Sequence, residues 1–127
     1  MENHPERRDT RRIIVGPEHM IHFVVKGHPF QNVRVTNLSF GGCFAVVGQG
    51  DASLFVQGTI LEQLAFEHPD LAGGGSITAE VRYVLGGSGG GAGFDFLGLG
   101  IQFLAVPPES KKVLADFVER SSSLPSA

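Results

Sequence analysis

The sequence predicts an all-β fold, a six-stranded antiparallel β-barrel with one C-terminal α-helix and a flexible basic N-terminal arm. Three observations predict it. Short segments rich in Val, Ile and Phe are separated by glycine, proline or polar turns, which is typical of a β-barrel or a sandwich. Near the C-terminus the apolar period changes from two residues to nearly four. Four of the ten Lys and Arg residues lie within six positions near the N-terminus.

The chain of 127 residues has the length of one domain. Hydrophobic residues make up 42% and charged residues 18%, which is usual for a globular protein and argues against disorder of the whole chain. We expect three parts: a flexible arginine-rich arm at 1–12, a barrel with its closing helix at 13–120, and a disordered tail at 121–127. No attached output domain is expected.

Six segments have the features of strands. They are residues 19–25, 32–38, 42–47, 59–67, 77–83 and 97–104. The fifth shows the clearest alternation, with four apolar residues on one face and three polar residues on the other: Ile77, Ala79, Val81 and Tyr83 against Thr78, Glu80 and Arg82. In the sixth, Gly98 and Gly100 occupy positions where a small barrel needs close backbone approach.

A helix is expected after the sixth strand. Val113, Leu114, Phe117 and Val118 form one apolar stripe at helical spacing. Pro108 suits the first helical position, because its fixed φ is compatible with the first turn. This helix should close the barrel.

Cysteine content and the N-terminal sequence predict a cytoplasmic protein without membrane insertion. Cys43 is the only cysteine, so no intrachain disulfide can form. The first twelve residues lack the apolar core of a signal peptide, and no segment approaches the roughly 18 apolar residues of a membrane span. Since Cys43 lies in an apolar strand, we expect it to be a small buried hydrophobe and not a nucleophile.

No catalytic or metal-binding constellation has a recognisable spacing, so we expect neither an enzyme nor a metal site. The glycine-rich stretch 86–93 contains no GxGxxG and is not followed by the Lys-Ser or Lys-Thr of a Walker loop. It and the stretch 72–76 are expected to be flexible loops. His19 and His22 are three residues apart, which places their side chains on opposite faces of a strand.

Two features are not explained by folding, and the first is the arginine cluster. Arg8 and Arg12 are four residues apart, as are Arg7 and Arg11, and a step of four returns to the same side of a helix or an extended chain. In an extended chain each pair spans about 13 Å, at about 3.3 Å per residue, which is the scale of a small nucleotide. Arginine pairs with phosphate oxygens or with guanine O6 and N7. From spacing alone, a solvated basic tail is the alternative.

The second feature is the strand end "TNLSFGGCF". A plain hairpin needs only a short turn such as Asn-Gly. Here the polar residues and glycines are spread over six positions, as Asn37, Ser39, Gly41 and Gly42. This spacing indicates a strand end that holds something, and the spacing alone does not say what.

Read together, "ERRDTRRIIV", "TNLSFGGC", "LGLGIQF" and the terminal helix resemble a PilZ domain, the bacterial receptor module for cyclic di-GMP (c-di-GMP). The resemblance covers residues 6–120. The family carries RxxxR near its start, which Arg8 to Arg12 match best and Arg7 to Arg11 also satisfy. It carries [D/N]xSxxG after its second strand, matched here by "NLSFGG".

The resemblance implies a c-di-GMP receptor without catalytic activity or metal. Arg8 and Arg12 would clasp guanine and phosphate, while Asn37 and Ser39 would hydrogen-bond a guanine. Gly42 would leave room for close approach, because a Cβ would obstruct the backbone turn or the ligand. Many members have aspartate in place of Asn37, and a neutral amide cannot receive both guanine N–H groups as a carboxylate does, so weaker binding is expected. The arm would order on binding and present a new surface to an unidentified partner protein.

Two other functions stay open. One is an interaction adaptor with a PilZ fold that does not bind the nucleotide. The other is a small barrel that binds single-stranded nucleic acid, with Phe40 and Phe44 as stacking platforms. The net charge of -3 argues against a nucleic acid polymer as partner, and both rings are expected to pack instead. The oligomeric state is open, a homodimer included.

Overall fold

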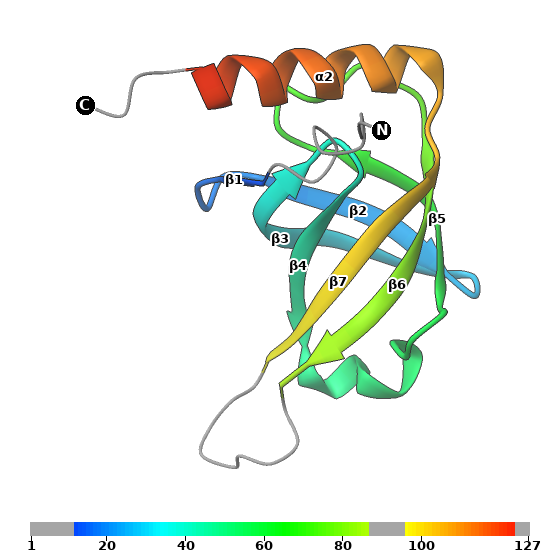
Figure 1. The fold of residues 1–127 in the computed structure, drawn as a ribbon. Coiled ribbons are helices and arrows are strands. Elements are labelled where there is room, and N and C mark those ends of the chain that lie inside the picture. Colours follow the sequence, from blue (N-terminus) through cyan, green and yellow to red (C-terminus); the bar gives the residue numbers. More distant parts are fainter. Residues whose placement is uncertain (1–11, 87–95, 124–127) are drawn as a thin grey trace, which may run out of the picture.

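The computed structural model describes residues 12–86 and 96–123, which form seven antiparallel strands, one 3-10 helix and one α-helix (Figure 1). In chain order the elements are β1 (Ile13–Ile14), β2 (Met20–Val25), β3 (His28–Ser39), β4 (Gly42–Gly48), the 3-10 helix (Gln49–Leu54), β5 (Ile60–Phe66), β6 (Ile77–Leu85), β7 (Phe96–Ala105) and α2 (Pro108–Ser123).

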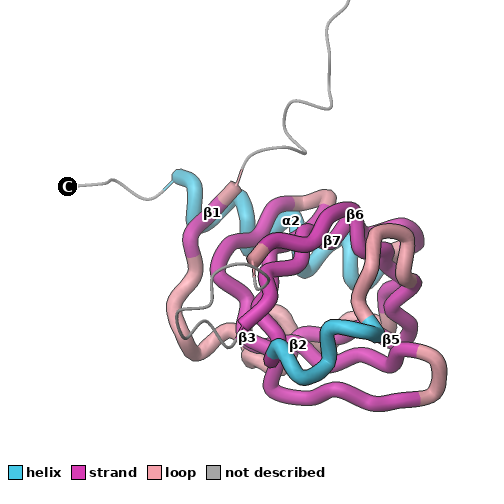
Figure 2. The backbone as a smooth tube through the Cα atoms, turned by 90° about the horizontal axis from the view of Figure 1, so that it is seen from below, coloured by secondary structure: helices cyan, strands magenta, loops and turns pink. Residues whose placement is uncertain are grey.

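Six of these strands close into a barrel. The sheet runs from β3 through β2, β5, β6 and β7 to β4, and β4 pairs back with β3. Figure 2 shows the ring of strands along its axis. The predicted six-stranded antiparallel barrel with one C-terminal helix is therefore confirmed.

The sequence did not predict β1. Strand β2 pairs with β3 only as far as Arg34. The two residues of β1, Ile13 and Ile14, pair with the remaining end of β3, opposite Leu38 and Asn37. The short strand therefore continues the sheet edge and brings the N-terminal segment beside the β3–β4 turn.

The two ends of the barrel are covered by different elements. Helix α2 lies across one end, and the 3-10 helix lies at the opposite end (Figure 1). Phe55, the residue after the 3-10 helix, is buried against Phe23 and Phe30 at ring-centroid distances of 6.1 and 5.2 Å. Aromatic packing thus anchors the connection between β4 and β5.

Helix α2 begins at Pro108, as predicted, and its apolar stripe packs toward the barrel. Leu114, Phe117 and Val118 are buried, and Val113 is partly buried. No helix in the described ranges has the length and apolarity that crossing a membrane requires.

The glycine-rich stretch 72–76, expected to be a flexible loop, packs against the start of α2. The Ser110 hydroxyl donates a hydrogen bond of 2.8 Å to the carbonyl oxygen of Gly75. A Cβ on Gly74 would lie 2.7 Å from the Cα of Ser110, so only glycine fits there. Most of the other stretch, from residue 87 onward, lies outside the described residues.

The predicted orientation of Tyr83 is wrong. Val81 pairs with Ile101 and Tyr83 pairs with Gly100, so β6 carries one more residue than β7 over this interval. This β-bulge changes the alternation, and Tyr83 lies outside the barrel, 44% exposed, together with the neighbouring Arg82.

Gly98 and Gly100 do allow close contacts with β7, but the groups that approach them are aromatic rings and not backbone segments. An added Cβ would lie closer than 3.0 Å to the Phe44 ring at Gly98 and to the Tyr83 ring at Gly100. The two rings are 6.2 Å apart between centroids. Phe44 therefore packs across the outside of β7.

Candidate functional site

Strand β1 brings the two sequence motifs together. Because Ile13 pairs with Leu38 in an antiparallel ladder, the preceding Arg12 comes level with the end of β3. The Arg12 Nη1 group donates a hydrogen bond of 2.7 Å to Oδ1 of Asn37. The last arginine of the first motif is thus bonded to the first residue of the second motif, 25 positions later.

The second motif forms the turn between β3 and β4. Ser39 pairs with Gly42, which leaves Phe40 and Gly41 as the turn residues. The buried Ser39 hydroxyl donates to the Gly42 carbonyl oxygen at 3.3 Å. The Gly41 carbonyl oxygen accepts a hydrogen bond of 2.8 Å from the backbone N–H of Phe103. The turn is therefore held both internally and against β7.

Gly42 is required by strand packing. It pairs with Gln102 on β7, and an added Cβ would lie closer than 3.0 Å to the carbonyl oxygen of Ile101 and 3.3 Å from the Cα of Gln102. The sequence predicted an obstruction of the turn or of the ligand. The structure shows that a Cβ there would meet the backbone of the neighbouring strand β7.

A surface pocket of about 440 Å³ lies beside this turn, within the size range of small-molecule sites. Its lining consists of Arg12, Ser39, Gly41, Gly42, Arg82, Tyr83, Gly100, Ile101 and Gln102. Four predicted site residues therefore line one pocket, and Asn37 is bonded to one of them. The other predicted residues, Arg7, Arg8 and Arg11, lie outside the described residues.

The wall of the pocket that β6 and β7 supply was not predicted from the sequence. Arg82 donates a hydrogen bond through Nη1 to Oε1 of Gln102, and Tyr83 lies next to Arg82. The polar positions of the two strands were visible in the alternation, and they indicate outward-facing side chains. The outward orientation of Tyr83 could not be predicted, because a β-bulge cannot be recognised in the alternation of apolar and polar residues.

The pocket is cationic. Among the residues that the structure describes, neither Arg12 nor Arg82 forms an ion pair with a carboxylate. Their guanidinium groups can therefore serve an anionic ligand, for which arginine is well suited by its planar arrangement of donors.

Cys43 follows Gly42 in β4 and is buried. Burial raises the pKa of its thiol to about 12, while the nearby Arg12 acts in the opposite direction. The side chain is fully buried, and its thiol stays protonated at neutral pH. The prediction of a small buried hydrophobe is confirmed.

A second and larger surface pocket, of about 560 Å³, lies along β3 and β4. It contains none of the predicted site residues. Its lining includes Phe30, Arg34, Thr36, Val46 and Phe96, and it is mostly apolar. We favour the smaller pocket as the functional site, because only that pocket joins both motifs.

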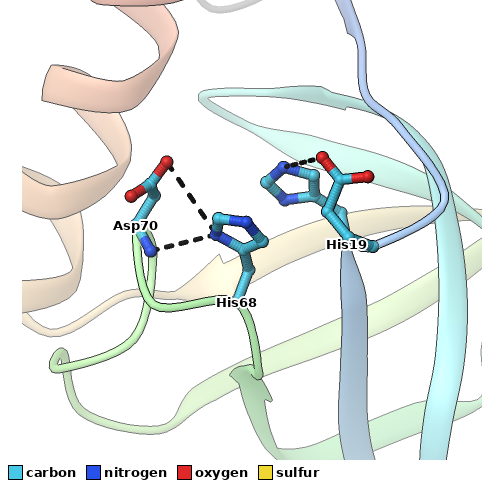
Figure 3. Close-up of polar contacts among 4 residues, drawn as sticks. His19, His68 and Asp70 are labelled. Carbon is cyan, nitrogen blue, oxygen red and sulfur yellow. Dashed lines mark hydrogen bonds and ion pairs between the residues drawn. The ribbon is translucent and has the colours of Figure 1, made fainter.

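A cluster of Glu18, His19 and His68 has potential metal-ligand atoms within 4.8 Å of one another. Figure 3 shows His19 and His68 together with Asp70. The two imidazole rings are stacked at 4.1 Å with an angle of 15° between their planes. The His68 Nδ1 atom accepts a hydrogen bond of 3.0 Å from the backbone N–H of Asp70, so the neutral ring carries its proton on Nε2. In that form His68 has no free lone pair for a metal, so the arrangement fits a stacked ring pair better than a metal centre.

The stacked pair makes stability depend on pH. Burial, with a further contribution from His68, lowers the pKa of His19 below its ordinary value of 6.5, and Glu18 and Asp70 oppose this. His19 therefore takes up a proton more readily in the unfolded chain than in the folded one. As a result, the contribution of His19 to the free energy of unfolding is fully present above pH 6.5. It decreases as the pH falls through 6.5 toward the lower pKa of His19 in the folded state. Urea unfolding on both sides of that pH should show the decrease.

The matched variant for this prediction is His19→Phe. It keeps a ring against His68 and against Phe117, whose ring centroid lies 5.4 Å from that of His19, but it cannot bind a proton. We expect it to lose less stability than the natural chain on acidification. An equal loss would show that His19 is not the responsible group.

Several solved structures share this fold. The PilZ domain of YcgR from Escherichia coli, determined with c-di-GMP, is 16% identical, with a TM-score of 0.69, and the alignment covers 91% of this chain and 92% of that one. MrkH of K. pneumonia in its apo state is 11% identical, with a TM-score of 0.74 and coverage of 95% and 50%. The MrkH–c-di-GMP complex is 12% identical, with a TM-score of 0.68 and coverage of 86% and 49%. The chain thus spans about half the length of MrkH.

The likeness to these structures shows the fold, and the sequence itself shows the family. No curated protein sequence matches the chain. The family model described as "PilZ domain" matches residues 6–120, nearly the whole sequence and both of its motifs. The chain belongs to the PilZ domain family.

Proposed function

We propose that the protein is a cytoplasmic, non-catalytic receptor for c-di-GMP, which binds in the pocket between the β3–β4 turn and strands β6 and β7. The observation that carries the proposal is the hydrogen bond between Arg12 and Asn37 at a cationic pocket that Ser39, Gly41 and Gly42 also line. Folding alone does not require two charged and polar motifs, 25 residues apart, to meet at a pocket.

The chemistry of the pocket suits this ligand. Cyclic di-GMP carries two phosphates and two guanines, so its site needs cations and groups that read base edges. The Arg12 guanidinium can pair with a phosphate or with guanine O6 and N7. Asn37 uses its Oδ1 for Arg12, which leaves its amide N–H groups as donors. Arg8 is proposed as the second clasping arginine, with Arg7 and Arg11 as the alternative pair.

The similar structures support the ligand. The YcgR PilZ domain and MrkH have both been determined with c-di-GMP. The pocket described here is built from the same two motifs by which the family is recognised. We therefore assign c-di-GMP to this chain as well.

The response to the ligand is proposed to pass to a partner protein. Residues before β1 would fold over the bound nucleotide and complete a surface that is absent from the free protein. Arg12 is already held by β1 and Asn37, which lowers the entropic cost of using its guanidinium in binding.

The proposal is tested by calorimetric titration of the full chain with c-di-GMP, GMP and cyclic di-AMP. We expect binding of the first at concentrations where the other two do not bind, because both motifs are needed to hold two guanines and two phosphates. Removal of residues 1–12 should abolish the binding. Equal affinity for all three nucleotides, or no binding of c-di-GMP, would contradict the proposal.

A further inference from the structure

The pocket has a wall that the two motifs do not account for. It is formed by β6 and β7 and includes Arg82, Tyr83 and Gln102. These residues come from the middle of two neighbouring strands, and the register of the sheet brings them beside Ser39 and Gly42.

The wall depends on the β-bulge in β6. In a regular strand Arg82 and Tyr83 would point to opposite faces, and Tyr83 would enter the core. The extra residue between the pairs Val81–Ile101 and Tyr83–Gly100 places both side chains on the outer face. Bulges commonly re-aim side chains next to functional sites.

The Tyr83 ring packs over Gly100 of β7, which provides the space for it. An added Cβ at Gly100 would lie 2.7 Å from Cδ2 of the Tyr83 ring and even closer to two further ring atoms. The Cδ2–Cε2–Cζ part of the ring is therefore packed against the strand. Since Tyr83 is still 44% exposed and lines the pocket, the rest of its side chain is accessible to a ligand.

The environment of the ring resembles a base-binding platform. Phe44 supports it from the side at 6.2 Å between ring centroids. Arg82 lines the same pocket, and its guanidinium is held by its hydrogen bond to Gln102. A fixed aromatic face beside an arginine is an arrangement on which a purine base stacks while the cation contacts its edge or phosphate.

We infer that Tyr83 is the stacking platform for one guanine of the ligand and that Arg82, positioned by Gln102, contacts the same nucleotide. The inference rests on the proposed function and extends it, because it gives the β6–β7 wall a specific part in binding. A purely structural role of Tyr83, as a cover for Gly100, would not respond to the ligand.

The chain itself supplies a probe for this inference, since it contains one tyrosine and no tryptophan. Tyrosine fluorescence therefore reports on Tyr83 alone. Stacking of guanine on the ring should shorten the fluorescence lifetime as c-di-GMP is added, and a lifetime, unlike an intensity, is unaffected by absorption of light by the nucleotide. The same titration with GMP at concentrations that do not bind is the control.

Affinity measurements on substituted chains give the second readout. Tyr83→Leu, which keeps the bulk but lacks the π face, should weaken c-di-GMP binding roughly 5- to 150-fold, the equivalent of losing one base–aromatic stack. Tyr83→Phe should bind within about twofold of the natural chain, because the face is preserved. The matched control is Phe96→Leu, which removes an exposed ring of the same hairpin outside the pocket.

The outcomes separate the two proposals. If the natural chain does not bind c-di-GMP by calorimetry, the proposed function fails, and the inference fails with it. If the natural chain binds and folded Tyr83→Leu binds equally well, only the stacking platform is overturned. Should Tyr83→Leu fail to fold, the lifetime of the natural chain decides, and an unchanged lifetime at saturation overturns the inference.

Discussion

Arg12→Ala is expected to weaken c-di-GMP binding by about 1 to 3 kcal/mol, roughly 5- to 150-fold, the range for losing one bidentate contact. Arg12 is the residue in which both motifs meet, because it precedes β1 directly and donates to Asn37. Its loss removes a cation from the pocket and also leaves the Asn37 amide without its partner. Calorimetry of the purified variant measures the change.

The matched control for this prediction is Arg34→Ala. Arg34 is also an exposed arginine, in β3, but it lines the larger pocket and not the site. It should change the affinity little beyond the small long-range effect of one charge. If Arg12→Ala retained the affinity of the natural chain, or if both substitutions weakened binding equally, Arg12 would not be a ligand contact.

Gly42→Ala is expected to destabilise the fold by about 1 to 3 kcal/mol, the usual cost of an inserted methyl group in a well-packed place. The new Cβ would meet the Ile101 carbonyl oxygen, which belongs to the β7 backbone and cannot rotate away. Strand β4 would have to move from β7, and the turn beside the pocket would move with it. Urea unfolding gives the free energy, and c-di-GMP affinity should fall as well.

Gly50→Ala provides the comparison at a glycine with free space. No atom lies within 4 Å of a Cβ built there, and the backbone is not in the left-handed region. Its free energy of unfolding should remain within about 0.5 kcal/mol of the natural value, as for most surface substitutions. A Gly42→Ala chain as stable as the Gly50→Ala chain would show that β4 and β7 are not packed as described.

The barrel strands could be predicted because each buries one face, and this leaves a period of two in the sequence. Val33 and Val35 in β3 are examples, since both are buried as the alternation indicated. The apolar stripe of α2 was visible for the corresponding helical reason. In contrast, β1 has only two residues, too few to show a period, and it exists because β3 offers an unpaired edge.

The candidate site was predictable only where its residues lie close together in the sequence. The motifs that contain Arg12, Asn37 and Ser39 could be identified from local spacing, but their meeting depends on the pairing of β1 with β3. Arg82 and Gln102 are brought together by the register of two long strands, and single-sequence patterns do not fix that register.

Gly42 shows a further limit of motif reasoning. Its place in the second motif suggested a need for space around a ligand. The structure gives a sufficient reason in the barrel itself, since β7 lies directly against it. A motif glycine can therefore serve the geometry of the site indirectly, by fixing the strand that carries the other site residues.

The most direct test of the account is an NMR titration of the full, isotope-labelled chain with c-di-GMP, followed by the amide shifts of assigned residues. We predict that the largest saturable shifts fall on Arg12, Ser39, Gly41, Tyr83 and Gln102, which surround the smaller pocket. Arg34 and Phe96, in the larger pocket, should change little. The absence of saturable shifts, or their concentration on the larger pocket, would contradict a c-di-GMP receptor built at the junction of β1, β3 and the β6–β7 wall.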